Sequence, residues 1–493
     1  MAADTTESGE PHGAPRDVLK NEDEGYHKVL SSRQIQMIAI GGSIGTGLFM
    51  GAGGRLAMGG PALAFIYALC GFFAFLVIRA LGELVMHRPS SGSFVSYSRE
   101  FYGERMAFTA GWLYWLNWAT TSIADVTAAA LYMNFFKNYV EWLQPVPQWV
   151  FALGTLVIVL ALNLVSVKVF GELEFWLALI KVAAIVTFLL VGIYFVLFRV
   201  PIEGTVPGFH LISENGGFFP NGLAASFVII QGVVFGFGGI ELVGTAAGEA
   251  DDAKTVMPKA IRTVIFRLVF FYVGSVLLFA LLLPYTAYQT GESPFVTFFG
   301  KIGVDGADLI MNMVVLTAVI SSLNSGLYST GRILHSMAIA GSAPRFAARM
   351  NRAGVPYGGI VITAVVTVFG VVLNAFVPSQ AFEIGLNLSA LGIVSAWAII
   401  MLCQLRLYKW SKEGKMERPE FRIFGAPYTG YLTLVFLGLV LVLMAFDWPV
   451  GTGTMGALVV IIVPALLIGW RMAKVRIAQI IKEEGEIKEI DFS

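Results

Sequence analysis

The most informative run of the sequence is Ile40-Gly41-Gly42-Ser43-Ile44-Gly45-Thr46-Gly47-Leu48-Phe49, which has four glycines within seven positions of an apolar segment. A later apolar segment repeats the feature in Phe235-Gly236-Phe237-Gly238-Gly239-Ile240-Glu241. Glycine alone is consistent with close helix packing, because small residues let two backbones approach in lipid. Paired glycine breaks in corresponding segments are instead typical of transporters built from two inverted repeats. The pairing therefore favours two interrupted helices.

The composition around these runs is that of a membrane protein. Of the 493 residues, 56% are hydrophobic and 13% are charged, and the mean hydropathy is +0.74. These values exclude a soluble enzyme. The 33 Lys and Arg residues balance 33 Asp and Glu residues, so the net charge indicates no nucleic-acid partner. The sequence also lacks a phosphate-binding Walker loop, a serine-hydrolase elbow and a zinc-binding His pair, so we expect neither enzymatic chemistry, nor a metal, nor a cofactor.

Apolar windows predict an all-α integral membrane protein with twelve transmembrane helices, each long enough to cross a hydrocarbon core of about 30 Å. In chain order the predicted spans are residues 35–56, 61–85, 108–136, 149–167, 175–197, 223–247, 264–284, 309–330, 358–377, 384–405, 430–446 and 452–470. The glycine runs fall in the first and sixth spans. The predicted organisation is a tail (1–33), a first inverted repeat with helices 1–5 (34–200), a second with helices 6–10 (201–407), two peripheral helices (408–472) and a second tail (473–493).

The gaps between the predicted spans are alternately basic and non-basic. Of the 33 Lys and Arg residues, only four fall on the less basic side, and one, Lys181, lies within a span. Because cytoplasmic loops carry the excess of positive charge, this pattern predicts a cytoplasmic N-terminus. The even number of spans predicts that the C-terminus lies on the same side.

An interrupted helix at mid-membrane predicts a binding site. Its unpaired backbone groups cannot face lipid and must line a cavity. Gly45 lies about 16 Å from the cytoplasmic start of its span at 1.5 Å per residue, which is close to the bilayer midplane. A half-helix that begins near Gly47 offers free N–H groups that suit a carboxylate, and free carbonyls suit an ammonium group. The expected ligand is therefore an α-amino acid zwitterion.

Ionisable residues within spans are costly, which makes them candidates for function, and four stand out. Lys181 is either a proton carrier, since burial favours its neutral form, or a structural ammonium bound to carbonyls of the first helix. Glu241 either caps freed N–H groups or relays protons. Asp125 either faces the substrate or makes a helix-to-helix hydrogen bond. Arg267 is expected near the cytoplasmic lipid headgroups.

Small polar residues also occur in the eighth predicted span, in the run Ser321-Ser322-Leu323-Asn324-Ser325-Gly326. They either pack closely against another helix or line the cavity. We expect mixed use, with Ser322 and Asn324 as the candidates for lining the cavity.

Several runs resemble the amino acid transporter family of the amino acid, polyamine and organocation superfamily, and the similarity extends from Gly25 to Trp470. They are Ile44-Gly45-Thr46-Gly47-Leu48-Phe49, the stretch 60–84 and Asn324-Ser325-Gly326-Leu327-Tyr328. Other runs are similar to those of bacterial L-asparagine permeases within that family, including Pro89-Ser90-Ser91-Gly92-Ser93-Phe94-Val95-Ser96-Tyr97 and Ser293-Pro294-Phe295-Val296-Thr297-Phe298-Phe299.

This resemblance implies the leucine-transporter fold, with a 5+5 inverted repeat and discontinuous helices 1 and 6, in a bacterial inner membrane. It implies that the carboxylate of the substrate binds the backbone N–H groups around Thr46 and Gly47, next to Gly45. The ammonium group would bind carbonyls of Ser43, Phe235 and Gly238, and the Phe235 ring would cover the substrate.

The resemblance also matches Lys181 to a lysine that replaces a sodium ion in proton-coupled relatives. Asp125 stands where most of the wider family has Glu, which makes it a candidate for side-chain selectivity. The function expected from all this is proton-coupled import of L-asparagine by alternating access, with the proton as coupling ion. A permease or exchanger for another neutral or aromatic amino acid is the alternative, and a ligand-gated channel or sensor is a more distant one.

Overall fold

The computed structural model describes residues 37, 44–90, 92–242, 244 and 253–491, and within these ranges the regular structure is helical apart from one β-bridge between Ile202 and Thr205. The α-helices are α3 (Thr46–Phe49), α4 (Gly51–Gly59), α5 (Leu63–His87), α6 (Ser93–Tyr102), α7 (Glu104–Phe135), α8 (Gln148–Val165), α9 (Val167–Leu197), α10 (His210–Glu214), α11 (Gly222–Val228), α12 (Ile230–Gly236), α14 (Ala253–Leu282), α15 (Pro294–Lys301), α16 (Ala307–Ile339), α17 (Tyr357–Phe376), α18 (Pro378–Lys412), α19 (Tyr428–Ala445), α20 (Val450–Ala457) and α21 (Val463–Asp491). A π-helical turn, Leu458–Ile462, joins α20 to α21.

Eight helical segments in the described part of the chain are long and apolar enough to cross a membrane. They are Gly51–His87, Gln148–Val165, Val167–Leu197, Ala307–Ile339, Tyr357–Phe376, Ala381–Lys412, Tyr428–Ala445 and Val450–Lys482. A multi-pass membrane protein is therefore confirmed. The count of twelve stays a prediction. The eight segments do not include α7 or the predicted spans 223–247 and 264–284, where the apolar helices Gly222–Gly236 and Val269–Leu282 are shorter. The first and sixth predicted spans also run into residues 38–43 and 245–247, which lie outside the described ranges.

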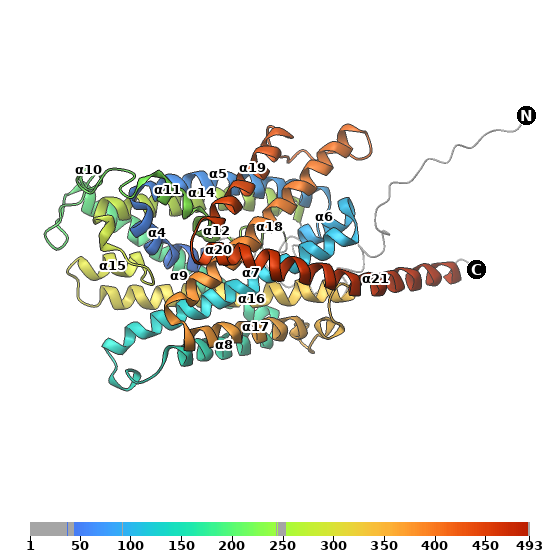
Figure 1. Cartoon of the computed structure of the whole chain (residues 1–493), viewed down its shortest axis with the longest axis horizontal. Helices are drawn as coiled ribbons and strands as arrows, with labels where there is room; N and C mark the ends of the chain where they lie inside the picture. Colours follow the sequence, from blue (N-terminus) through green and yellow to red (C-terminus); the bar gives the residue numbers. More distant parts are fainter. Residues whose placement is uncertain (1–36, 38–43, 91, 243, 245–252, 492–493) are drawn as a thin grey trace, which may run out of the picture.

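Helix α7 lies at the centre of the molecule, where it contacts α6, α8, α16, α17 and α18 (Figure 1). Its middle third carries a polar stripe that includes Asn117, Thr121 and Asp125, and all three side chains are buried. This face of α7 cannot contact lipid, because unsatisfied polar groups cost several kcal/mol in hydrocarbon. The more apolar neighbours of α7 therefore surround it.

Three helices begin or end beyond the predicted spans. Helix α9 begins at Val167, eight residues before the predicted start, while α16 continues to Ile339 and α18 to Lys412. The earlier start of α9 brings Glu174 into the helix, where its side chain is fully buried. Carboxylates such as Glu174 predict a loop when they are taken alone, but a buried partner allows them inside a membrane helix.

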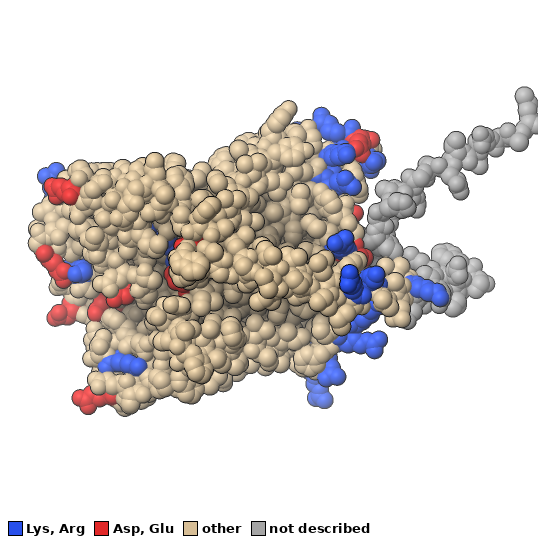
Figure 2. Space-filling model, in the orientation of Figure 1, with Lys and Arg blue, Asp and Glu red and all other residues tan. Residues whose placement is uncertain are grey.

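The charged residues of the surface are unevenly distributed along the long axis of the molecule. Figure 2 shows most of the visible Lys and Arg at the end from which α21 projects, and a mixture of acidic and basic side chains at the opposite end. This uneven distribution is the pattern that the alternating basic gaps of the sequence predict.

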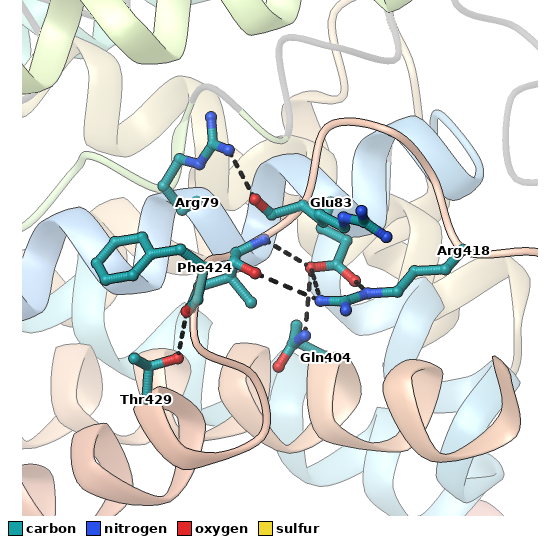
Figure 3. A network of polar contacts seen from close by, with 8 residues as sticks. Arg79, Glu83, Gln404, Arg418, Phe424 and Thr429 are labelled. Atoms are coloured by element: carbon teal, nitrogen blue, oxygen red, sulfur yellow. Dashed lines mark hydrogen bonds and ion pairs between the residues drawn. The ribbon is translucent and has the colours of Figure 1, made fainter. Parts of the chain in front are cut away.

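A buried carboxylate anchors the segment between α18 and α19 to α5 (Figure 3). The Glu83 side chain is fully buried and accepts hydrogen bonds from Arg418 Nε at 2.6 Å, from the Ile423 backbone N–H at 2.9 Å and from Gln404 Nε2 at 3.2 Å. Nearby, Arg79 donates to the Arg422 carbonyl at 2.6 Å. The sequence suggests a same-face pair of Arg79 with Glu83 within α5, yet the charged partner closest to the carboxylate comes from 335 residues away.

We expect Arg418→Ala to destabilise the fold by about 3 kcal/mol, because it leaves the Glu83 charge buried without its cation. The measurement is the unfolding temperature of the purified protein in detergent. Arg422→Ala is the control, since this exposed side chain sits in the same segment and only its backbone carbonyl contacts α5. Equal unfolding temperatures for the two variants would contradict a stabilising role for the Glu83–Arg418 ion pair.

Candidate functional site

The two glycine-rich runs meet in the interior of the structure. Gly45 is the extended residue that precedes α3, and a Cβ atom added to Gly47 would lie 2.5 Å from Gly236 Cα and 3.2 Å from the Phe235 ring. Real Cβ contacts are essentially never as short as the first of these. The backbones of α3 and α12 can therefore touch only because Gly47 has no side chain.

The second run ends a helix. Helix α12 stops at Gly236, and Phe237 to Glu241 form turns in which Gly239 has a φ of +90°. The buried Glu241 carboxylate accepts a hydrogen bond from the Gly239 N–H at 3.3 Å. This contact matches the first of the two alternatives for Glu241, in which its carboxylate caps a freed backbone N–H group. The course of the chain through residues 245–252 lies outside the described ranges.

One small cavity lies where the two runs meet, between α3, α7, α12, α16 and α18. Six of the predicted site residues line it, namely Gly45, Thr46, Gly47, Phe235, Gly238 and Ser322. The other lining residues are Asn117, Trp118, Thr121, Gly236, Gly239 and Ile393. The arrangement combines backbone at the helix breaks, the aromatic side chains of Phe235 and Trp118 and a polar wall, which are the parts that a zwitterionic ligand needs.

The polar wall of the cavity is held in place by α18. Ser389 Oγ donates to Asn117 Oδ1 at 2.8 Å, and the Ser389 and Thr121 hydroxyls share a hydrogen bond. Asn117 and Thr121 are four residues apart, so they lie on one face of α7. The sequence identifies the polar stripe that contains them but not which members reach the cavity.

Asp125 lies behind the cavity and not at its surface. Its side chain is fully buried and accepts a hydrogen bond from the Thr46 hydroxyl, which ties α7 to α3. Ser322 also interacts with the carboxylate. Of the two alternatives for Asp125, the structure thus has the geometry of the helix-to-helix hydrogen bond. Any effect of Asp125 on a ligand therefore passes through Thr46 or Ser322.

Lys181 forms a buried polar cluster with a carboxylate that sequence reasoning missed. Its Nζ donates to Ser321 Oγ at 2.8 Å and lies 3.8 Å from Glu174 Oε1, and the Ser321 hydroxyl donates to the same Glu174 oxygen at 2.5 Å. Asp125 also interacts electrostatically with Lys181. The signal available in the sequence was the seven-residue spacing of Glu174 and Lys181, which places both on one face of α9.

Asn324, the other candidate for lining the cavity, is not among the residues that line it. Its Oδ1 accepts a hydrogen bond from Asn163 Nδ2 of α8 at 2.6 Å. Two residues along a helix correspond to a rotation of about 200°, so Ser322 and Asn324 face opposite ways. Ser43, whose carbonyl is expected to accept a hydrogen bond from the ammonium group of the substrate, and the Arg267 side chain lie outside the described residues.

An ion pair joins α4 to the start of α18. Arg55 makes two hydrogen bonds to Glu383 of α18, at 2.9 and 2.7 Å, and its guanidinium lies against Gly232 of α12. The charge pattern of the sequence places Arg55 at the outer, less basic end of the first predicted span, yet only 6% of this residue is exposed. Its partner is 328 positions away, so no local pattern reveals the pair.

Known proteins match this chain along nearly its whole length. The family model described as amino acid permease matches residues 34–484. The chain is 57% identical to the L-asparagine permease of Escherichia coli K12, with 100% of this chain and 99% of that protein aligned. It is 58% identical to L-asparagine permease 1 of Mycobacterium tuberculosis H37Rv over 94% of each chain, and 53% identical to the L-asparagine permease of Streptomyces coelicolor over 92% of each.

These relatives are named as permeases, which are transporters and not enzymes. The family match covers both glycine-rich runs, the polar stripe of α7 and the Lys181 cluster. The protein therefore belongs to the amino acid permease family.

Proposed function

We propose that this protein imports L-asparagine together with protons across the bacterial plasma membrane by alternating access. The observation that carries the proposal is the cavity at the junction of α3 and α12, since its lining suits an amino acid zwitterion with a polar side chain. The names of the full-length relatives support L-asparagine as the substrate. Twelve spans in a leucine-transporter fold, with both termini in the cytoplasm, complete the proposal, and the basic end of the molecule supports this orientation.

The backbone at the two breaks would hold the charged groups of the substrate. The first N–H groups of a helix have no intrahelical acceptor, so those around Thr46 and Gly47 can bind the carboxylate. Carbonyls of Ser43, Phe235 and Gly238 would bind the ammonium group. The Phe235 carbonyl already accepts the Gly238 N–H at 2.9 Å but keeps a second lone pair. The Phe235 ring would cover the bound substrate.

The polar wall of α7 would recognise the carboxamide of the substrate. Asn117 has both a donor and an acceptor group, as a carboxamide does, and Thr121 adds a hydroxyl beside it. Both side chains are fixed by Ser389, so they lose little freedom when a ligand binds. Asp125 would act on selectivity indirectly, because it positions the Thr46 side chain.

Proton coupling would use the cluster around Lys181. Lys181 and Glu174 are both fully buried, and Ser321 bridges them, so a proton can pass between two groups that face each other without solvent. The electrostatic link from Lys181 to Asp125, and from Asp125 to Thr46, connects this cluster to the cavity. Glu241 is a second candidate for proton relay, next to Gly239 of the cavity wall.

Gly47→Ala is expected to abolish uptake, because the new methyl group would overlap Gly236 and push α3 away from α12. Uptake of radiolabelled L-asparagine in a transport-deficient host measures this, normalised to the amount of protein in the membrane. Gly438→Ala of α19 is the matched control, since a Cβ atom there meets nothing within 4 Å. Normal uptake by Gly47→Ala would remove the contact between the two runs from the mechanism.

Asn117→Ala is expected to weaken apparent asparagine affinity about tenfold, the effect of losing about 1.4 kcal/mol of hydrogen bonding. Competition of asparagine uptake by unlabelled asparagine and by alanine measures it. Alanine has no carboxamide, so its apparent affinity should change much less. An equal loss for both ligands would contradict carboxamide recognition by Asn117. Asp125→Glu tests whether Asp125 affects selectivity by positioning Thr46. Unchanged asparagine uptake and unchanged competition by other amino acids in this variant would contradict that role.

In proteoliposomes, uptake by the unmodified protein is expected to follow an imposed inward proton gradient and to ignore sodium. Lys181→Ala should lose gradient-driven accumulation but keep exchange of labelled for unlabelled asparagine, because exchange needs no net proton movement. Glu174→Gln should weaken the dependence on the gradient. Uptake that follows sodium and not the proton gradient would refute the role proposed for Lys181.

A further inference from the structure

A second and larger cavity lies away from the proposed transport site. It is an apolar groove of about 680 Å³ between α7, α21 and the loop that follows α16. One wall is made by side chains of α7, including Phe108, Trp112 and Leu116, and the other by Ile461, Leu466 and Gly469. A groove of this size and lining fits an extended hydrocarbon chain.

One end of the groove is polar. Ser342 lines it and is 4% exposed, and its hydroxyl has no hydrogen-bond partner among the described residues. Arg476, also a lining residue, donates from Nη1 to the Ala343 carbonyl at 2.8 Å. The guanidinium of the exposed Arg345 lies close enough to interact electrostatically with that of Arg476. A buried hydroxyl without a partner and two neighbouring cations are the groups that bind a phosphate.

The position of the groove favours a lipid headgroup as the source of such a phosphate. Val459, Val460 and Ile461 are 64–73% exposed on the wall formed by the π-helical turn, within the membrane-span candidate Val450–Lys482. The groove is therefore open toward hydrocarbon. Figure 2 shows that the basic side chains gather at the end of the molecule where α21 projects, and Arg476 belongs to that helix. Basic pockets of this kind bind anionic lipid headgroups.

We propose that the groove binds one anionic phospholipid, with an acyl chain between α7 and α21 and the phosphate held by Arg345, Arg476 and Ser342. A free phosphate would leave the apolar length of the groove unused. A zwitterionic lipid would bring its own cation toward the two guanidinium groups, so the charge favours an anionic headgroup. The site is distinct from the substrate cavity, although both contact α7.

The bound lipid would also support the wall of the substrate cavity. Trp112 donates from Nε1 to the Ser342 carbonyl at 3.1 Å, and Leu116 directly precedes Asn117. An acyl chain against Trp112 and Leu116 would thus pack behind the turn of α7 that carries Asn117. This consequence rests on the proposed function, whereas lipid binding itself does not.

The test is native mass spectrometry of the purified full-length protein with phosphatidylglycerol or phosphatidylcholine of the same acyl chains, and with inorganic phosphate. We expect one phosphatidylglycerol to bind at least tenfold more tightly than phosphatidylcholine, and inorganic phosphate at millimolar concentration not to displace it. Arg345→Gln, which removes no hydrogen bond within the described structure, should reduce this preference several-fold. Gly469→Leu, which fills the groove beside Phe108, should abolish retention of the lipid.

Arg422→Gln is the matched control, an exposed arginine outside the groove, and it should bind lipid like the unmodified protein. Equal binding of the two lipids would overturn the proposal. Phosphatidylglycerol binding that neither Arg345→Gln nor Gly469→Leu reduces would also overturn it. A third contrary result is a dimer that Gly469→Leu dissociates with no change in bound lipid, because the groove would then hold a second copy of the chain. Transport is not part of this readout, so failure here leaves the proposed function standing.

Discussion

Backbone polar groups inside a membrane must be satisfied within the protein, and this constraint explains why the two glycine-rich runs lie together. A helix end at mid-membrane would be costly against lipid. Here the end of α12 packs directly on α3 through Gly47 and Gly236, and Glu241 caps the turn that follows. The close approach of Gly47 to Gly236 places the backbone of each run against protein at that point.

Enclosing the two runs requires polar helices around them, which determines the position of α7. Asn117 and Thr121 bond to Ser389, while Asp125 bonds to Thr46, so one face of α7 meets both α18 and α3. The same stripe makes this face of α7 too polar for contact with lipid. Apolar side chains such as Val459, Val460 and Ile461 are instead exposed on peripheral helices, where they suit hydrocarbon.

Local patterns predicted the parts of the site that depend on backbone chemistry. The glycine runs and Lys181 are recognisable because glycine clusters and lone charges are rare within apolar spans, whereas the role of Phe235 came from the family resemblance. The rest depends on helix rotation and on distant partners. Asn117 and Asp125 belong to the same stripe, but they are about 12 Å apart along the helix, and Thr46 stands in front of only the second. Glu174 looked like a loop residue because its partner, Ser321, is 147 positions away.

Two carboxylates, the partly exposed Glu383 and the fully buried Glu83, hold α18 and the segment after it near opposite ends of that helix. Glu383 pairs with Arg55 of α4, near the start of α5, while Glu83, near the end of α5, pairs with Arg418 just beyond α18. Separating either pair exposes a charge that loses its partner, which costs more than breaking a surface ion pair. Glu383 lies near the start of α18, while Gln404, which also donates to Glu83, lies near its end. The two pairs therefore tie opposite ends of α18 to α4 and α5, and displacing either end costs the free energy of its pair.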